Sequence, residues 1–92
     1  MKASYAWDEA KRARNLETHG LDFADAKLVF EDADKLTLDA TREGEARFQD
    51  IAKIEGLVLS LAYTIRGAKV RVISFRRASR KERKAFDDWS QL

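Results

Sequence analysis

The segment 57–78, LVLSLAYTIRGAKVRVISFRRA, constrains the fold most, because it combines two strand-forming runs with a tight turn. The first run is rich in Leu, Val, Ile and Tyr. The second alternates charged with β-branched residues, a pattern typical of a half-buried strand. Gly67 between them offers the backbone freedom that a two-residue hairpin turn requires. Glu55-Gly56 predicts a second such turn after a strand at 48–54, and the sequence therefore predicts a three-stranded meander.

The turn lengths also predict the register of this meander. Arg66 is expected to oppose Lys69, and Ala62 to oppose Ile73, while the earlier turn aligns Gln49 with Ala62. Opposed side chains share a face, so one face is predicted to be core and the other basic. The predicted core side chains are Phe48, Ala52, Ile54, Leu57, Leu59, Leu61, Tyr63, Ile65, Val70 and Val72. The other face, named the basic plate, is defined by Arg47, Gln49, Lys53, Ser60, Thr64, Arg66, Lys69 and Arg71, with Glu45 at its border.

Two helices are predicted before the strands. Asp8 and Asp22 suit the N-cap positions of these helices, the first of which covers residues 9–18. Gly20 suits the left-handed residue that follows the first helix. The side chains expected on the inward faces are Ala10, Ala13 and Leu16 of the first helix, and Phe23, Ala26 and Phe30 of the second.

A short strand and a last helix complete the predicted domain. Residues 35–39 alternate as a strand, expected to pair antiparallel with the next one. Ser79 and Glu82 form a capping-box pattern that starts a helix with Phe86 and Trp89 on one side. The prediction is a single α+β domain over residues 1–92, with two N-terminal helices, a four-stranded antiparallel sheet and a C-terminal helix.

The net charge of +2 conceals a strong asymmetry. Residues 66–84 contain nine Lys or Arg against the single acidic Glu82, whereas residues 21–45 contain eight acidic residues against three basic ones. Solvated surface is the usual role of such runs. Here the basic block includes strand positions that face one side, which favours a polyanion partner.

Composition excludes several other classes of protein. The chain has no cysteine, so disulfides and thiolate metal sites are excluded, which suits a reducing cytosol. The first fourteen residues lack an apolar run, so neither a signal peptide nor a membrane span is expected, and a cytoplasmic location is predicted. One histidine among scattered carboxylates shows no metal-ligand spacing, so no metal and no cofactor are expected.

Several short motifs occur in order along residues 5–86. They include Trp7-Asp8-Glu9, Asn15-Leu16, His19-Gly20, Phe23-Ala24-Asp25-Ala26, Gly44-Glu45, Arg47, Tyr63-Thr64, Arg66-Gly67, Arg71 and Arg76-Arg77-Ala78. No single motif is specific, but the ordered set resembles the BrnT family, toxins of bacterial type II toxin–antitoxin pairs. The chain departs from the family pattern at Ile51-Ala52-Lys53, where Ile-Gly-Arg is usual, and at Phe75, where Ala is usual.

The resemblance implies a RelE-like fold and a ribonuclease that inhibits translation and growth. It also implies a partner, a BrnA-like ribbon-helix-helix antitoxin that neutralises the toxin. The complex of the two would bind operator DNA and repress its own promoter. RNA would be the substrate.

Metal-independent RNA cleavage requires deprotonation of a 2′-hydroxyl, stabilisation of the phosphorane and protonation of the leaving 5′-oxygen. Arginines on a rigid sheet suit the second task, because the guanidinium fork matches phosphate oxygens and stays charged. Arginine is a poor proton shuttle, which leaves Glu45, Lys53 and Lys69 as candidates, with the base undecided. The predicted catalytic residues are Glu45, Arg47, Arg66 and Arg71, and the predicted RNA-binding residues are Lys53, Thr64, Lys69 and Arg77.

Several residues, and the function itself, admit other interpretations. The plate could consist of cross-strand ion pairs on an exposed face. His19 suits a structural role at a helix C-terminus better than catalysis, and Trp7 and Tyr5 could stack on bases or pack into the core. Strict alternation places Arg76 on the core side, so Arg77 is the predicted binder. The alternative functions are a non-catalytic RNA- or DNA-binding module, and a decayed toxin that acts only in promoter autorepression.

Overall fold

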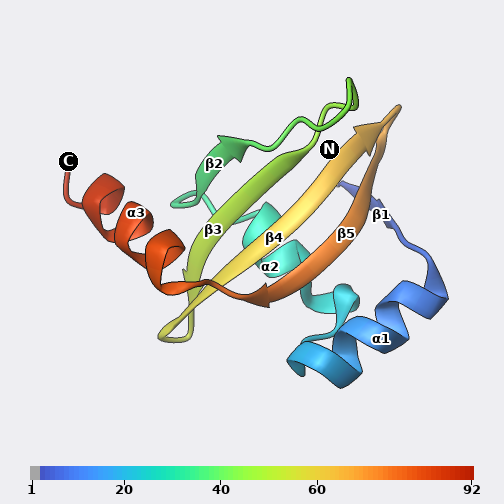
Figure 1. Cartoon of the computed structure of the whole chain (residues 1–92), viewed down its shortest axis with the longest axis horizontal. Helices are drawn as coiled ribbons and strands as arrows, with labels where there is room; N and C mark the ends of the chain where they lie inside the picture. Colours follow the sequence, from blue (N-terminus) through green and yellow to red (C-terminus); the bar gives the residue numbers. More distant parts are fainter. Residues whose placement is uncertain (1–2) are drawn as a thin grey trace.

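The computed structural model describes residues 3–92 as one five-stranded sheet with helices on both faces (Figure 1). The strand order is β1-β5-β4-β3-β2, and only β1 runs parallel to its neighbour. The predicted α+β class is confirmed. The elements are β1 (Ser4–Ala6), α1 (Glu9–His19), the 3₁₀ turn η1 (Phe23–Asp25), α2 (Lys27–Phe30), β2 (Leu36–Asp39), β3 (Phe48–Ile54), β4 (Leu57–Arg66), β5 (Lys69–Arg77) and α3 (Arg80–Ser90).

Two details of the predicted architecture are wrong. The sheet has a fifth strand, because β1 pairs in parallel with β5 and places Tyr5 beside Val70. A strand of three residues is too short to show alternation in a sequence. The second predicted helix is the 3₁₀ turn η1 followed by the four-residue α2.

The two hairpin turns are confirmed. Glu55 and Gly56 both have positive φ angles, 50° and 84°, as a type I′ turn requires. Gly67 has a φ of 59°, and Arg66 pairs with Lys69 on either side of the turn. The register between β3 and β4 is also as predicted, with Gln49 opposite Ala62.

The register between β4 and β5 changes at a β-bulge. Tyr63 pairs with Val72, but Ala62 pairs with Ser74, so Ile73 is the extra residue and the predicted pairing of Ala62 with Ile73 is wrong. Beyond the bulge the alternation of β5 is inverted. Phe75 and Arg77 therefore share the core side with Leu61 and Leu59, whereas Ser74 and Arg76 share the side of Ala62 and Ser60, which is the face of the plate.

A buried asparagine binds the backbone just after this bulge. Asn15 of α1 accepts a hydrogen bond from the Phe75 N–H at 3.1 Å and donates one to the Phe75 carbonyl at 2.7 Å. Since β1 covers only positions 69–71 of β5, Asn15 takes the place of a strand neighbour at the uncovered part of the edge. The predicted apolar stripe of α1 is wrong, because Ala10, Ala13 and Leu16 are exposed.

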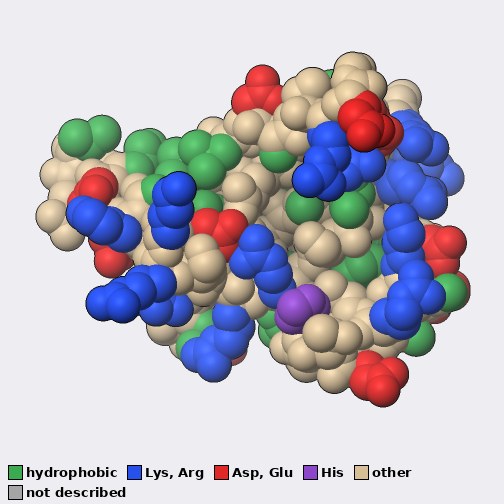
Figure 2. Space-filling model, viewed as in Figure 1, with side chains coloured by type: hydrophobic (Ala, Val, Ile, Leu, Met, Phe, Trp, Pro, Cys, Tyr) green, Lys and Arg blue, Asp and Glu red, His purple; other side chains and the backbone are tan. Residues whose placement is uncertain are grey.

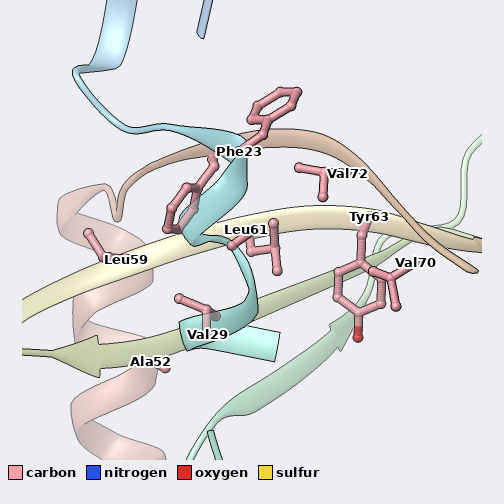
Figure 3. Packing of buried hydrophobic residues seen from close by; sticks show 10 residues of the cluster. Phe23, Val29, Ala52, Leu59, Leu61, Tyr63, Val70 and Val72 are labelled. Atoms are coloured by element: carbon pink, nitrogen blue, oxygen red, sulfur yellow. The ribbon is translucent and has the colours of Figure 1, made fainter. Parts of the chain in front are cut away.

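The main core lies between the sheet and the segment formed by η1 and α2 (Figure 3). The predicted burial of Leu59, Leu61, Val70 and Val72 is confirmed. Leu57 and Ile65 lie at strand ends and are 42% and 45% exposed. The buried members are Phe23, Ala26, Val29, Ala52, Leu59, Leu61, Tyr63, Val70, Val72 and Phe75.

One carboxylate is buried on the core side. Asp50 is fully buried and accepts hydrogen bonds from Lys35 Nζ at 2.7 Å, Thr37 Oγ1 at 2.7 Å and the Tyr63 hydroxyl at 3.1 Å. Burial, and then the nearby charge of Asp50, raise the pKa of Tyr63. A buried charge is tolerated when it is paired and hydrogen-bonded in this way.

Helix α3 packs on the opposite face of the sheet (Figure 1). Phe86 is buried against Ile51 and Ala78, with Trp89 and Val58 packed beside them. The predicted capping box of Ser79 and Glu82 is confirmed. α3 thus covers the half of this face near the β3–β4 turn and leaves the other half open. No helix within residues 3–92 is long and apolar enough to cross a bilayer.

Candidate active site

The structure divides the predicted basic plate, because Lys53 lies at the opposite end of the sheet. The name basic plate is kept from here on for the part at the β4–β5 turn, which consists of Arg47, Thr64, Arg66, Lys69 and Arg71 with Glu45 at its border. Arg66 lies opposite Lys69, as predicted, and Thr64 lies opposite Arg71. Thr64 is 4% exposed, and its hydroxyl donates a hydrogen bond to the Ala46 carbonyl at 2.7 Å. This bond fixes the segment that leads into β3 against β4. Figure 2 shows Lys and Arg side chains gathered on this face.

A tight turn places Glu45 against two arginines. Arg42 and Glu45 close the turn with two backbone hydrogen bonds of 2.9 and 3.1 Å, and Glu43 and Gly44 adopt positive φ angles of 53° and 80°. Glu45 carboxylate oxygens lie 3.8 Å from a terminal nitrogen of Arg47 and 3.8 Å from one of Arg66. At that separation the contacts are ionic without being good hydrogen bonds, so both guanidinium groups retain donors for another ligand.

Arg47 has a donor that no other group within residues 3–92 satisfies. Its Nε atom is buried and has no hydrogen-bond partner among residues 3–92. Buried polar atoms are nearly always hydrogen-bonded, so such an atom in a native protein requires an explanation. Because Nε itself is buried, a ligand would contact Arg47 through the exposed part of its guanidinium group.

The structure brings six of the eight predicted site residues to this end of the sheet. The six are Glu45, Arg47, Thr64, Arg66, Lys69 and Arg71. Lys53 lies at the other end, opposite Val58, which is six residues from Thr64 along β4 and hence about 20 Å away. Arg77 pairs with Leu59 on the core side, so the alternation on which its predicted role depended is wrong.

A second polar cluster on the same face was missed in the sequence. Arg76 binds Glu82 end-on, because its two terminal nitrogens donate hydrogen bonds of 2.8 and 2.9 Å to the two carboxylate oxygens. Gln49 donates to the Ser60 hydroxyl and to the Glu82 carboxylate. The Arg76 hydrogen bonds contribute most to lowering the pKa of Glu82, to about 2, and Glu82 in turn raises the pKa of Arg76. The capping box indicated Glu82, but only the bulge brings Arg76 to it.

The N-terminal aromatic side chains pack inward. The Trp7 ring lies edge-on to Phe23, with ring centroids 6.3 Å apart, and its indole N–H donates to Glu9. Tyr5 lies edge-on to Phe30 at 6.0 Å. Of the two interpretations of these aromatics, packing is the one that the contacts favour. His19 is the last residue of α1.

The chemistry available at the plate is phosphate recognition beside a carboxylate. Arg47, Arg66 and Arg71 offer fixed cations, and Glu45 offers a proton acceptor between two of them. Within residues 3–92, no group of three or more His, Asp or Glu side chains is placed to hold a metal ion.

A family model described as "Ribonuclease toxin, BrnT, of type II toxin-antitoxin system" matches residues 7–82. The matched region contains all the residues of the plate and both members of the Arg76–Glu82 pair. No curated protein matches the chain.

Proposed function

The chain belongs to the BrnT family of ribonuclease toxins from type II toxin–antitoxin systems, and from this premise we propose that it cleaves RNA on the basic plate without a metal ion. One observation supports this site most strongly. The carboxylate of Glu45 lies 3.8 Å from a terminal nitrogen of Arg47 and 3.8 Å from one of Arg66. A base beside cationic phosphate donors is what transesterification of RNA requires.

The proposed reaction uses the residues of the plate in three roles. Arg47, Arg66 and Arg71 bind the scissile phosphate and stabilise the charge that develops on its oxygens. Glu45 accepts the proton of the 2′-hydroxyl. The O2′–P bond forms, the P–O5′ bond breaks, and the leaving O5′ receives a proton from the ammonium group of Lys69, the residue that pairs with Arg66 across the β4–β5 turn. Thr64 holds the entry to β3 in position. The products are a 2′,3′-cyclic phosphate and a 5′-hydroxyl.

A type II toxin acts with a protein antitoxin. We propose that the antitoxin of this chain is a BrnA-like ribbon-helix-helix protein and that the complex binds operator DNA. The domain is RelE-like, spans residues 1–92 and acts in the cytoplasm. The α+β architecture with helices on both faces of the sheet is compatible with that assignment.

The experiment is a cleavage assay of purified protein on a structured RNA, with EDTA or with magnesium. We expect equal cleavage in both, and products that end in a 2′,3′-cyclic phosphate or 3′-phosphate. Arg66→Ala should lose activity by about 10²–10³-fold, on the scale of one preorganised charge-stabilising donor. Lys53→Ala, at the far end of the same sheet, is the matched control and should retain activity.

Two outcomes would contradict the proposal. Activity lost on chelation and restored by magnesium would exclude the metal-independent mechanism. If the wild-type protein cleaves no RNA and its expression does not slow growth, the chain is a non-catalytic module or a decayed toxin. Retained repression of its promoter, together with the antitoxin, would then identify the decayed toxin.

A further inference from the structure

A second group of cations lies where β5 ends and α3 begins. Four of the five residues from 80 to 84 are Lys or Arg, and Arg76 precedes them on β5 with 35% of its side chain exposed. The β-bulge places Arg76 opposite Ser60, on the face that carries the plate. Figure 2 shows that Lys and Arg side chains occur on this face at the end of the sheet, near its middle and again over α3.

These cations are not explained by the stability of α3. Cations in the first turns of a helix are disfavoured by the positive end of the helix dipole. Glu82 is the only acidic residue in the segment, and its carboxylate is already bound by Arg76, Gln49 and the Ser79 N–H. Arg80, Lys81 and Arg83 form no salt bridge within residues 3–92, and the one hydrogen bond of the Arg83 guanidinium goes to the uncharged Ala78 carbonyl at 3.3 Å. Their charge is therefore left for a ligand.

The distance between the two groups of cations suits a nucleic acid. Arg71 lies opposite Thr64 and Arg76 lies opposite Ser60, so the two pairs are four residues, or about 13 Å, apart along β4. A stacked strand covers this distance in about four nucleotides, at ~3.4 Å each. One RNA strand can thus contact both groups, whereas a very short RNA reaches only the plate.

We propose that Arg76, Arg80, Lys81 and Arg83 form a second phosphate-binding surface that holds the RNA several nucleotides from the scissile bond. This inference rests on the proposed ribonuclease function and specifies its substrate as an RNA long enough to reach from the plate to α3. Glu82 competes with that RNA for the guanidinium of Arg76.

The experiment compares binding of two RNAs of different length. Fluorescence anisotropy with fully 2′-O-methylated, uncleavable RNAs of three and twelve nucleotides gives affinity as a function of salt. Arg80→Ala and Lys81→Ala should each weaken binding of the longer RNA about fivefold at 0.1 M salt, and reduce its salt slope by ~0.7, which is the effect of one phosphate contact. Binding of the three-nucleotide RNA should not change. Lys27→Ala, on the exposed side of α2, is the charge-matched control and should change neither.

A second variant tests the competition for Arg76. Glu82→Gln keeps a capping-box side chain and removes the charge. It should strengthen binding of the twelve-nucleotide RNA and steepen its salt dependence, while leaving the three-nucleotide RNA unaffected. Glu17→Gln, an equal charge change on the exposed surface of α1, controls for net charge and should leave the affinity unchanged.

Each outcome either supports or overturns the inference. Equal effects of the α3 variants on both RNAs, or no effect on the longer RNA, would overturn the inference. Loss of antitoxin binding in these variants with RNA binding intact would also overturn it, because the surface would then be a protein interface. If Arg66→Ala abolishes binding of the three-nucleotide RNA while the α3 variants bind normally, only this inference fails. If the wild type binds neither RNA, the proposed function fails as well.

Discussion

At the scale of single residues, charge and geometry make separable contributions at the plate. Arg71 carries a fixed charge on a strand, but its value for catalysis lies in the planar fork, which a lysine does not reproduce. Arg71→Lys should therefore restore RNA affinity relative to Arg71→Ala while leaving the single-turnover rate low. Affinity and rate constants for the three proteins test this. If rate and affinity fall by the same small factor in both variants, Arg71 only binds RNA and does not stabilise the transition state.

Glu45 is the proposed general base, and a single substitution tests this role. Glu45→Gln keeps the shape and a hydrogen-bond acceptor but cannot take a proton. If Glu45 is the base, this variant should lose most of its cleavage rate, by about 10²–10⁴-fold, while its RNA affinity rises because a negative charge beside Arg47 and Arg66 is removed. The measurement is a single-turnover rate together with a binding curve. Substantial residual activity would mean that Glu45 only orients its two arginines.

At the scale of elements, β4 contains a matched pair of leucines on one face of the sheet. Leu61 is fully buried in the main core, whereas Leu57 lies on the same side at the strand end and is 42% exposed. Leu61→Ala should lower the free energy of unfolding by about 2–5 kcal/mol, because it removes buried methyl groups and leaves a cavity. Leu57→Ala should cost much less. Urea unfolding curves of both variants provide the comparison, and equal losses would contradict the assigned packing.

The junction between β5 and α3 should respond to acid. The pKa of Glu82 falls from 4.5 to about 2 on folding, chiefly through Arg76. Because the folded-state pKa is the lower one, the pair stabilises the protein above pH ~4.5, and this stabilisation is lost as the pH falls toward 2. Thermal unfolding between pH 6 and 2 should show a shallower loss for Glu82→Gln than for the wild type. Arg12 lowers the pKa of Asp22 to about 2, so this carboxylate titrates in the same range. Asp22→Asn is therefore measured alongside, so that the contribution of this second pair is separated from that of Glu82.

Sequence patterns predicted those elements whose signals are local. The turns at Glu55-Gly56 and Gly67, and the caps at Asp8 and Ser79, depend on residues next to each other in the chain, and all were predicted. The bulge at Ile73 was not predicted, because strict alternation of residues in β5 carries no signal for an extra residue. The Asn15 bonds to the backbone of Phe75 were not predicted either, because they cross sixty positions of sequence. Because Ile73 is an extra residue in β5, Arg76 lies on the face of the plate and Arg77 lies on the core side.

The candidate site was predictable to the same extent. Thr64, Arg66, Lys69 and Arg71 were predicted to lie together because the turns fix the register of β4 and β5. Glu45 and Arg47 were placed beside them because they directly precede β3. Lys53 was included because alternation places it on the same face, although the predicted register already put it opposite Val58, six residues from Thr64. The cover that α3 gives to that half of the face depends on tertiary packing and was not predicted.

At the scale of the whole molecule, many Lys and Arg side chains lie on the face of the sheet that α3 leaves half open (Figure 2). Attraction between this face and a polyanion steers association and weakens with salt. The same positive charge allows the face to bind a protein that mimics RNA. An antitoxin that presents carboxylates to the plate would block the substrate without distorting the site, and this is the simplest means of inhibition that the surface offers.

The last prediction follows from this competition. We expect an acidic segment of the antitoxin to lie across Arg47, Arg66 and Arg71 in the toxin–antitoxin complex, so that RNA and antitoxin exclude each other. Replacing all three arginines by alanine should weaken antitoxin binding and slow its association most at low salt, because screened charges matter less at high salt. Association rates at two ionic strengths would test this, with Lys53→Ala, remote from the plate, as the control. A complex that leaves the plate open while cleavage is still blocked would show that inhibition works by displacing Glu45 or another element, and direct occlusion would be excluded.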